Sequence, residues 1–108
     1  MKTLRFLGSS LDDLRMLPAS VRHELGAELF SVQLGNEPTD FKPMQIVGAG
    51  AYEMRVRDPS GAYRAIYVAK FAEVVYVLHV FQKKTQKTNK SDLALATKRY
   101  RLIRGLSE

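Results

Sequence analysis

Cysteine and tryptophan are absent from this chain, and histidine occurs only twice. Without cysteine there is no disulfide framework, no thiolate metal site and no cysteine nucleophile. The absence suits a reducing compartment, and we expect a cytoplasmic protein. No apolar run approaches the ~20 residues that a membrane helix needs, so no membrane association is expected. The N-terminal segment turns polar at Gly8, too early for a secretory signal.

No internal repeat, low-complexity tract or Pro/Gly/Ser-rich linker divides the sequence. Its 108 residues are 45% hydrophobic and 26% charged, which is typical of a globular protein. A chain of this length has room for one domain and one core. We therefore expect residues 1–108 to form a single domain.

The positive charge lies in one half of the sequence. Residues 1–50 hold five Lys/Arg and six Asp/Glu, a balance of −1, and residues 51–108 hold twelve and five, a balance of +7. Such asymmetry is expected of a surface that meets RNA, DNA or an acidic partner. The alternative is a bias that only aids solubility.

The N-terminal half predicts a strand over residues 2–7 followed by two helices. The second helix, after Pro18, carries a buried stripe at helical spacing: Val21, Leu25, Leu29 and Val32. Met44–Val47 is predicted as a short strand. Residues 51–82 alternate in the manner of a three-stranded meander, and a C-terminal helix begins near Ser91. This order indicates an α+β fold, a mainly antiparallel four- to five-stranded sheet packed by an N-terminal helical hairpin and a C-terminal helix.

The first hairpin of the meander gathers arginines. Asp58-Pro-Ser-Gly61 is a four-residue turn signal. It predicts that Arg55 faces Arg64 across the two strands, with Arg57 on the same side. A three-residue loop would shift the register by one and send Arg64 to the other face. Like charges directly opposite destabilise a sheet, so the predicted register makes sense if an anion lies between them.

A second basic cluster follows the last strand. His79 and Phe81 alternate toward one face, and Lys83, Lys84 and Lys87 come next. Metal ligation is not expected, because the two histidines lie on different elements and no His/Asp/Glu set has ligand spacing. No serine triad or carboxylate pair is recognisable either. What remains is a cationic site, and guanidinium and ammonium groups can stabilise the transition state of RNA cleavage by its own 2′-hydroxyl without metal or cofactor.

Each of these residues also has a purely structural interpretation. The three arginines fit a solvated strand face, and the lysines fit an exposed loop. Phe81 could stack on an RNA base, but it could equally be a packing residue. His79 could be a catalyst or, equally, a packing residue.

The segments Ala51–Tyr67 and Tyr76–Lys90, above all the hydrophobic strand that runs into Phe-x-Lys-Lys-Thr-x-Lys-Thr, resemble the phage-derived HigB-like branch of the RelE/ParE toxin superfamily. The order of elements resembles that family over nearly the whole chain. The resemblance implies the toxin of a type II toxin–antitoxin system, a metal-independent endoribonuclease that cuts messenger RNA on the ribosome. It also implies that a helix-turn-helix antitoxin neutralises the toxin. The complex would contact operator DNA only through this antitoxin.

By position, the resemblance assigns Arg64 and Lys83 or Lys84 to transition-state charge. It assigns no general base, and His79 is a candidate for that role. It assigns Arg55 and Arg57 to RNA binding, a role for which Phe81 and Lys87 are further candidates. Glu53 departs from the family, because the founding RelE toxins carry a lysine there, and their C-terminal tyrosine has no counterpart in residues 83–90. Two alternatives remain at this point: a ParE-like toxin that inhibits DNA gyrase, and a non-toxic nucleic-acid-binding adaptor.

Overall fold

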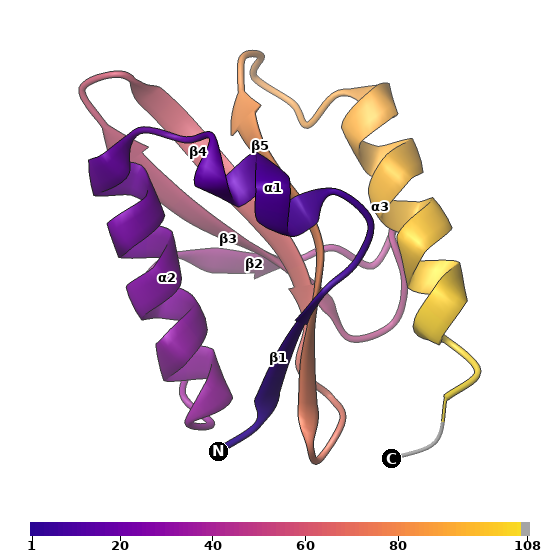
Figure 1. Ribbon diagram of the computed structural model, residues 1–108. Coiled ribbons are helices and arrows are strands. Elements are labelled where there is room, and N and C mark those ends of the chain that lie inside the picture. Colours follow the sequence, from indigo (N-terminus) through magenta and orange to yellow (C-terminus); the bar gives the residue numbers. More distant parts are fainter. Residues whose placement is uncertain (107–108) are drawn as a thin grey trace.

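The computed structural model describes residues 1–106, which form five strands and three helices (Figure 1). The elements are β1 (Thr3–Phe6), α1 (Ser10–Arg15), α2 (Ala19–Gln33), β2 (Phe41–Pro43), β3 (Ala51–Asp58), β4 (Gly61–Val68), β5 (Val74–Lys83) and α3 (Lys90–Ile103). No helix in this part of the chain is long and apolar enough to cross a bilayer. The expected α+β class is confirmed.

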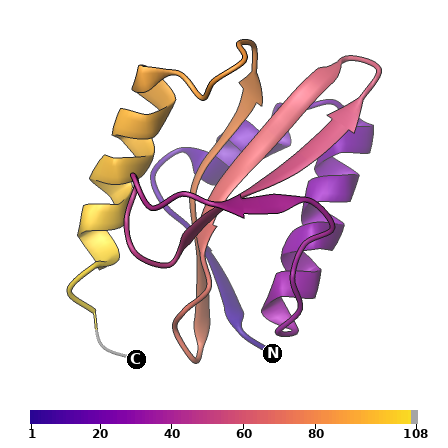
Figure 2. The same cartoon turned by 180° about the vertical axis from the view of Figure 1, so that it is seen from behind.

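The five strands form one mixed sheet in the order β1-β5-β4-β3-β2. Strands β2 to β5 are antiparallel neighbours, whereas β1 pairs with β5 in parallel. Figure 2, seen from behind, shows the long β3–β4 hairpin rising to its loop at the upper right, and β2 is the edge strand next to β3. The predicted strand at Met44–Val47 is wrong: the strand lies three residues earlier, and residues 45–47 form a turn.

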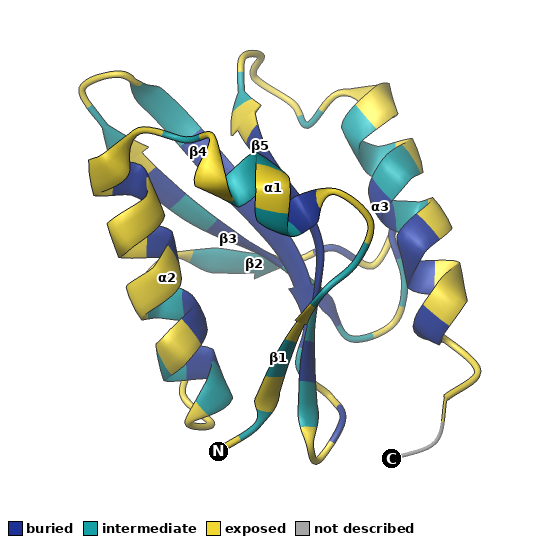
Figure 3. Ribbon diagram, in the orientation of Figure 1, coloured by how far each residue is buried: buried dark blue, intermediate teal, exposed yellow. Residues whose placement is uncertain are grey.

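Two cores, one on each face of the sheet, hold the layers together (Figure 3). On one face α2 packs its predicted stripe, in which no residue is more than 3% exposed, against alternate residues of β3, β4 and β5. On the other face α3 packs Ala96, Tyr100 and Ile103 against Ile66 and Leu78. The helix α2 ends at Gln33, and the φ of +93° at Gly35 then lets the amide of Asn36 donate to the carbonyl of Ser31.

A bulge in β5 decides which side chains of that strand meet the rest of the hairpin. Ile66 pairs with His79 but its neighbour Tyr67 pairs with Val77, which leaves Leu78 as an extra residue. The Leu78 carbonyl accepts a hydrogen bond of 2.8 Å from Nη1 of the buried Arg99. Because the bulge shifts the alternation by one residue, His79, Phe81 and Lys83 all face the side of the sheet that carries Arg64.

Asp58 joins the tip of the β3–β4 hairpin to the start of α2. One carboxylate oxygen accepts from the amide and hydroxyl of Ser60, at 2.8 and 2.6 Å, and the other accepts from the Ser20 hydroxyl at 2.9 Å. These bonds, the one from the Ser60 hydroxyl foremost, hold the pKa of Asp58 below its usual value.

Replacing Asp58 by alanine should lower the melting temperature at pH 7, because the turn and its bond to α2 are lost. Because the pKa of Asp58 is lower in the folded than in the unfolded protein, its carboxylate stabilises the fold at pH values above the unfolded pKa of about 3.9. That stabilisation is lost as the pH falls through the folded-state pKa. The difference between wild type and Asp58→Ala should therefore shrink in melts below about pH 4. Glu73→Ala, at an exposed site, is the control. A difference that is constant with pH would contradict the role of the charge.

Candidate nucleic-acid site

The register of the β3–β4 hairpin is the one predicted from the sequence. Arg55 pairs with Arg64, Val56 with Tyr63, and Arg57 with Ala62. Tyr63 and Val56 therefore point into the core beneath α2, and the arginines point to the opposite face. The neighbouring strand β5 adds Lys83, which pairs with Ala62 on this same face.

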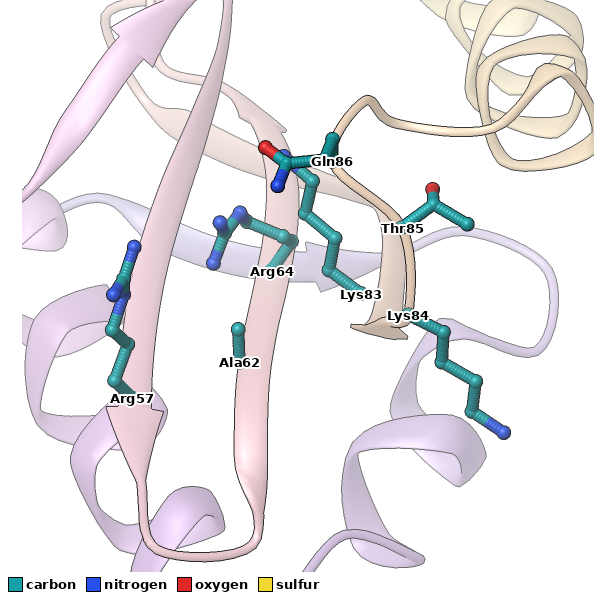
Figure 4. A pocket seen from close by; sticks show the side chains of 7 residues that line it. All are labelled: Arg57, Ala62, Arg64, Lys83, Lys84, Thr85 and Gln86. Atoms are coloured by element: carbon teal, nitrogen blue, oxygen red, sulfur yellow. The ribbon is translucent and has the colours of Figure 1, made fainter.

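An open pocket of about 550 Å³ lies where β3, β4 and the end of β5 meet. Seven of the described residues line it: Arg57, Ala62, Arg64, Lys83, Lys84, Thr85 and Gln86. None of these is acidic, and four carry a positive charge. Figure 4 shows Arg57, Arg64 and Lys83 extending from three different strands into the pocket, whereas the Lys84 side chain points away from them.

Arg64 forms the most restrained part of this pocket. Its side chain is only 4% exposed, and Nη1 donates to the carbonyl of Tyr63 at 3.1 Å. Its Nε lies 3.3 Å from Oε1 of Glu53, an ion pair not aligned as a hydrogen bond. Burial lowers the pKa of Arg64, an effect that Glu53 opposes. An arginine remains charged despite such a shift, so the pocket keeps a fixed guanidinium.

Lys83 lies half-buried at the end of β5, close to that guanidinium. Burial, followed by the charge of Arg64, lowers the pKa of its ammonium group. An ammonium group placed beside a second cation is stabilised when an anion enters between them. The arrangement therefore favours a bound phosphate or another compact anion.

The other predicted site residues lie outside the pocket lining. Arg55 is engaged by Asp40, whose Oδ1 accepts from Nε at 3.0 Å and from Nη2 at 2.8 Å. Lys87 is exposed on the loop, where its carbonyl accepts a hydrogen bond from Thr85. The structure thus brings together the side chains of Arg57, Arg64 and Lys83; Lys84 lines the pocket with its side chain turned away, and Arg55 and Lys87 lie outside it.

His79 and Phe81 are packing residues in this structure. They are 6% and 8% exposed, and their rings stack with centroids 4.7 Å apart. His79 Nε2 lies 2.7 Å from Oδ1 of Asp92 on α3, while Nδ1 is buried without a hydrogen-bond partner among the described residues. Neither ring is presented to the pocket, so a base-stacking role for Phe81 and a proton-transfer role for His79 would require them to become exposed.

Glu53, Thr88 and Gln86 belong to the site but were not among the predicted residues. Glu53 shares the face of Arg55 and Arg57 by simple alternation along β3, a signal present in the sequence. Its partnership with Thr88, whose hydroxyl donates to Oε2 at 3.1 Å, depends on how residues 84–89 fold back. No local pattern in the sequence shows that contact.

Comparisons with known proteins identify a family and a fold for this chain. A family model described as "Phage derived protein Gp49-like" matches residues 12–101. The free Escherichia coli toxin RelE, in a form with two arginines replaced by alanine, aligns with a TM-score of 0.65 and 24% identity over 91% of this chain and 96% of that one. A chain of the intact E. coli RelBE toxin–antitoxin complex aligns with a TM-score of 0.56 and 23% identity over 79% of this chain and 100% of that one. No curated protein matches.

Proposed function

Because the chain belongs to the Gp49-like family of phage-derived proteins and shares the fold of RelE, we propose that it is a type II toxin that cleaves messenger RNA on the ribosome. The observation that carries this proposal is the convergence of Arg57, Arg64 and Lys83 on one open pocket without an acidic residue in its lining. The fold is shared with proteins of several activities, and the argument for function therefore rests on the site.

The pocket suits an internal transfer reaction of RNA. The 2′-oxygen forms a bond to the adjacent phosphorus, the bond from phosphorus to the 5′-oxygen breaks, and the products carry a 2′,3′-cyclic phosphate and a 5′-hydroxyl. The attacking hydroxyl gives up its proton and the leaving oxygen gains one. Arg64 and Lys83 stabilise the negative charge that grows on the phosphate oxygens, and Arg57 holds the RNA at the pocket rim.

In this mechanism Lys83, which lines the pocket, also protonates the leaving oxygen. Its lowered pKa makes the ammonium group a stronger acid than an ordinary lysine. His79 is not among the residues that line the pocket, so it does not reach the reacting phosphate in this structure. The attacking proton therefore passes to water or to RNA in this mechanism, with no protein base assigned.

The partners follow from the same proposal. The ribosome presents the message, so the protein acts in the cytoplasm. A helix-turn-helix antitoxin neutralises it, and the complex contacts operator DNA through the antitoxin. The RelBE complex, to which this chain is similar in fold, is a toxin bound to its antitoxin.

Brief expression in bacteria, with mapping of message ends, tests the nuclease activity. Wild type should arrest growth and leave cuts confined to translated frames. The double variant Arg57→Ala/Lys83→Ala should lower cleavage about 100-fold or more, because two groups that stabilise phosphate charge are removed. Lys98→Ala/Arg101→Ala removes the same charge from exposed positions on α3 outside the pocket and should cut like wild type.

The other outcomes identify the rival functions. Growth arrest with intact messages and double-strand DNA breaks would replace the nuclease by a gyrase inhibitor. Normal growth of cells that accumulate the folded wild-type protein would leave a nucleic-acid-binding adaptor. Equal cleavage by the pocket variant and the α3 variant would show that the active site lies elsewhere.

A further inference from the structure

A fully buried carboxylate contacts Arg64, one of the residues that line the pocket. The Glu53 side chain is 0% exposed, yet it belongs to the strand that carries Arg55 and Arg57. A buried charge is costly unless it is paired and hydrogen-bonded. Glu53 meets that condition at one oxygen: Oε2 accepts from the Thr88 hydroxyl at 3.1 Å, whereas Oε1 is ion-paired without a hydrogen bond, 3.3 Å from Arg64 Nε and 4.0 Å from Lys42 Nζ.

The contact with Glu53 restrains the Arg64 guanidinium at its Nε edge. Glu53 lies against Nε, and the Tyr63 carbonyl accepts from Nη1. Two contacts at different edges of a planar group set the direction of its plane. Figure 4 shows that the guanidinium so held points into the pocket between Arg57 and Lys83.

The same carboxylate fixes part of the pocket wall. Residues 84–89 connect β5 to α3, and Lys84, Thr85 and Gln86 of this loop line the pocket. Thr88 ties the loop back to the sheet through its hydrogen bond to Glu53 Oε2. One side chain therefore holds both an arginine of the pocket and the loop beside it.

We propose that Glu53 is a positioning residue, which orients the Arg64 guanidinium and docks the loop at residues 84–89 so that the pocket is preorganised for the reacting phosphate. This inference rests on the proposed function of the pocket. It differs from a simple counter-charge in the sign of its effect. Removing a counter-charge leaves the pocket more positive and strengthens anion binding, whereas removing a positioning group weakens catalysis although the positive charge has increased.

Two substitutions separate orientation from charge. Glu53→Gln is isosteric and removes the charge, whereas Glu53→Asp keeps the charge and withdraws it by one methylene from Arg64. Positioning predicts that both are defective, and a counter-charge predicts that only Glu53→Gln differs from wild type. Glu24→Gln, at an exposed site on α2, changes the net charge by the same amount as Glu53→Gln and is the matched control. Circular dichroism and thermal melting establish which variants are folded. One folded Glu53 variant is enough for the measurements that follow.

The first readout requires no activity. In ¹H–¹⁵N relaxation measurements on the arginine side chains, the order parameter of the Arg64 Nε–H bond should fall to below about 0.6 in the Glu53 variants, because the guanidinium is no longer held. Glu24→Gln should leave it unchanged. An Arg64 signal that is the same in wild type and in a folded Glu53 variant would overturn the proposal. This result is independent of whether the protein cleaves RNA.

The second readout is cleavage of a defined message on purified ribosomes. We expect kcat to fall about 10- to 100-fold in both Glu53 variants, because the misplaced guanidinium fails in the transition state. KM should stay within about threefold of wild type. Unchanged or faster turnover by Glu53→Gln would identify a counter-charge and refute positioning. If wild type itself does not cut, the nuclease proposal fails, and the Arg64 spectrum still decides whether Glu53 holds the arginine.

Discussion

Replacing Arg64 by methionine should lower the free energy of unfolding by about 3 kcal/mol, because it leaves the Glu53 carboxylate buried without its nearest cation. In the variant Glu53 still accepts the hydrogen bond from the Thr88 hydroxyl, and Lys42 Nζ still lies 4.0 Å from Oε1. Neither replaces the positive charge that Arg64 placed 3.3 Å from that oxygen. Urea denaturation at pH 7 measures the loss. A cost below about 1 kcal/mol would show that water or another cation reaches Glu53 in the variant.

The double variant Arg64→Met/Glu53→Leu should recover most of that stability. Apolar residues of similar volume often replace a buried ion pair without loss, since neither charge then has to be desolvated. Recovery to within about 1 kcal/mol of wild type, with no RNA cleavage, would show that this pair serves the pocket and not the fold. Losses that simply add in the double variant would contradict the coupling between the two side chains.

Leu25→Ala should destabilise the protein by about 3–4 kcal/mol, because it opens a cavity in the centre of the contact between α2 and the sheet. Leu25 is 0% exposed and lies in the larger of the two cores. A domain of this size has a total stability of about 5–15 kcal/mol, so the variant should be near the limit of folding at 37 °C.

Phe30→Ala is the matched control for this core prediction. Phe30 lies on the same helix but is 50% exposed, and its removal should change stability by less than about 1 kcal/mol. The two variants are compared by urea denaturation under the same conditions. A similar loss of unfolding free energy in both variants would contradict the prediction, because it would mean that the exposed face of α2 contributes as much stability as its buried face.

The sequence predicted the β3–β4 hairpin well because its determinants are local. Asp58-Pro-Ser-Gly61 sets the turn, and the apolar alternation on either side allows one register in which the core face is continuous. That register brings Arg64 to the face of Arg55 and Arg57. The stripe of α2 was equally predictable, since helical spacing alone determines which residues face inward.

Other parts of the site depend on contacts between distant residues. The bulge at Leu78 turns Lys83 toward the pocket, and its stabilising partner, Arg99, is 21 positions away in the sequence. The burial of His79 and Phe81 requires α3 to cover that face, as Asp92 shows by its contact with the imidazole. Patterns within one strand indicate neither the bulge nor the cover by α3, so the sequence left both a chemical and a packing role open for His79 and Phe81, which the structure encloses.

The pairing of β1 with β5 has a consequence for how the molecule is assembled. Thr3 of the first strand lies beside Val74, 71 positions later, and β5 is its neighbour in the sheet. Contacts between such distant positions form late, because a long loop must close before they are gained. A chain synthesised only as far as β4 therefore carries all the hairpin arginines but lacks Lys83 and the strand that β1 pairs with. Formation of β5 completes the pocket and, in the same step, allows β1 to join the sheet.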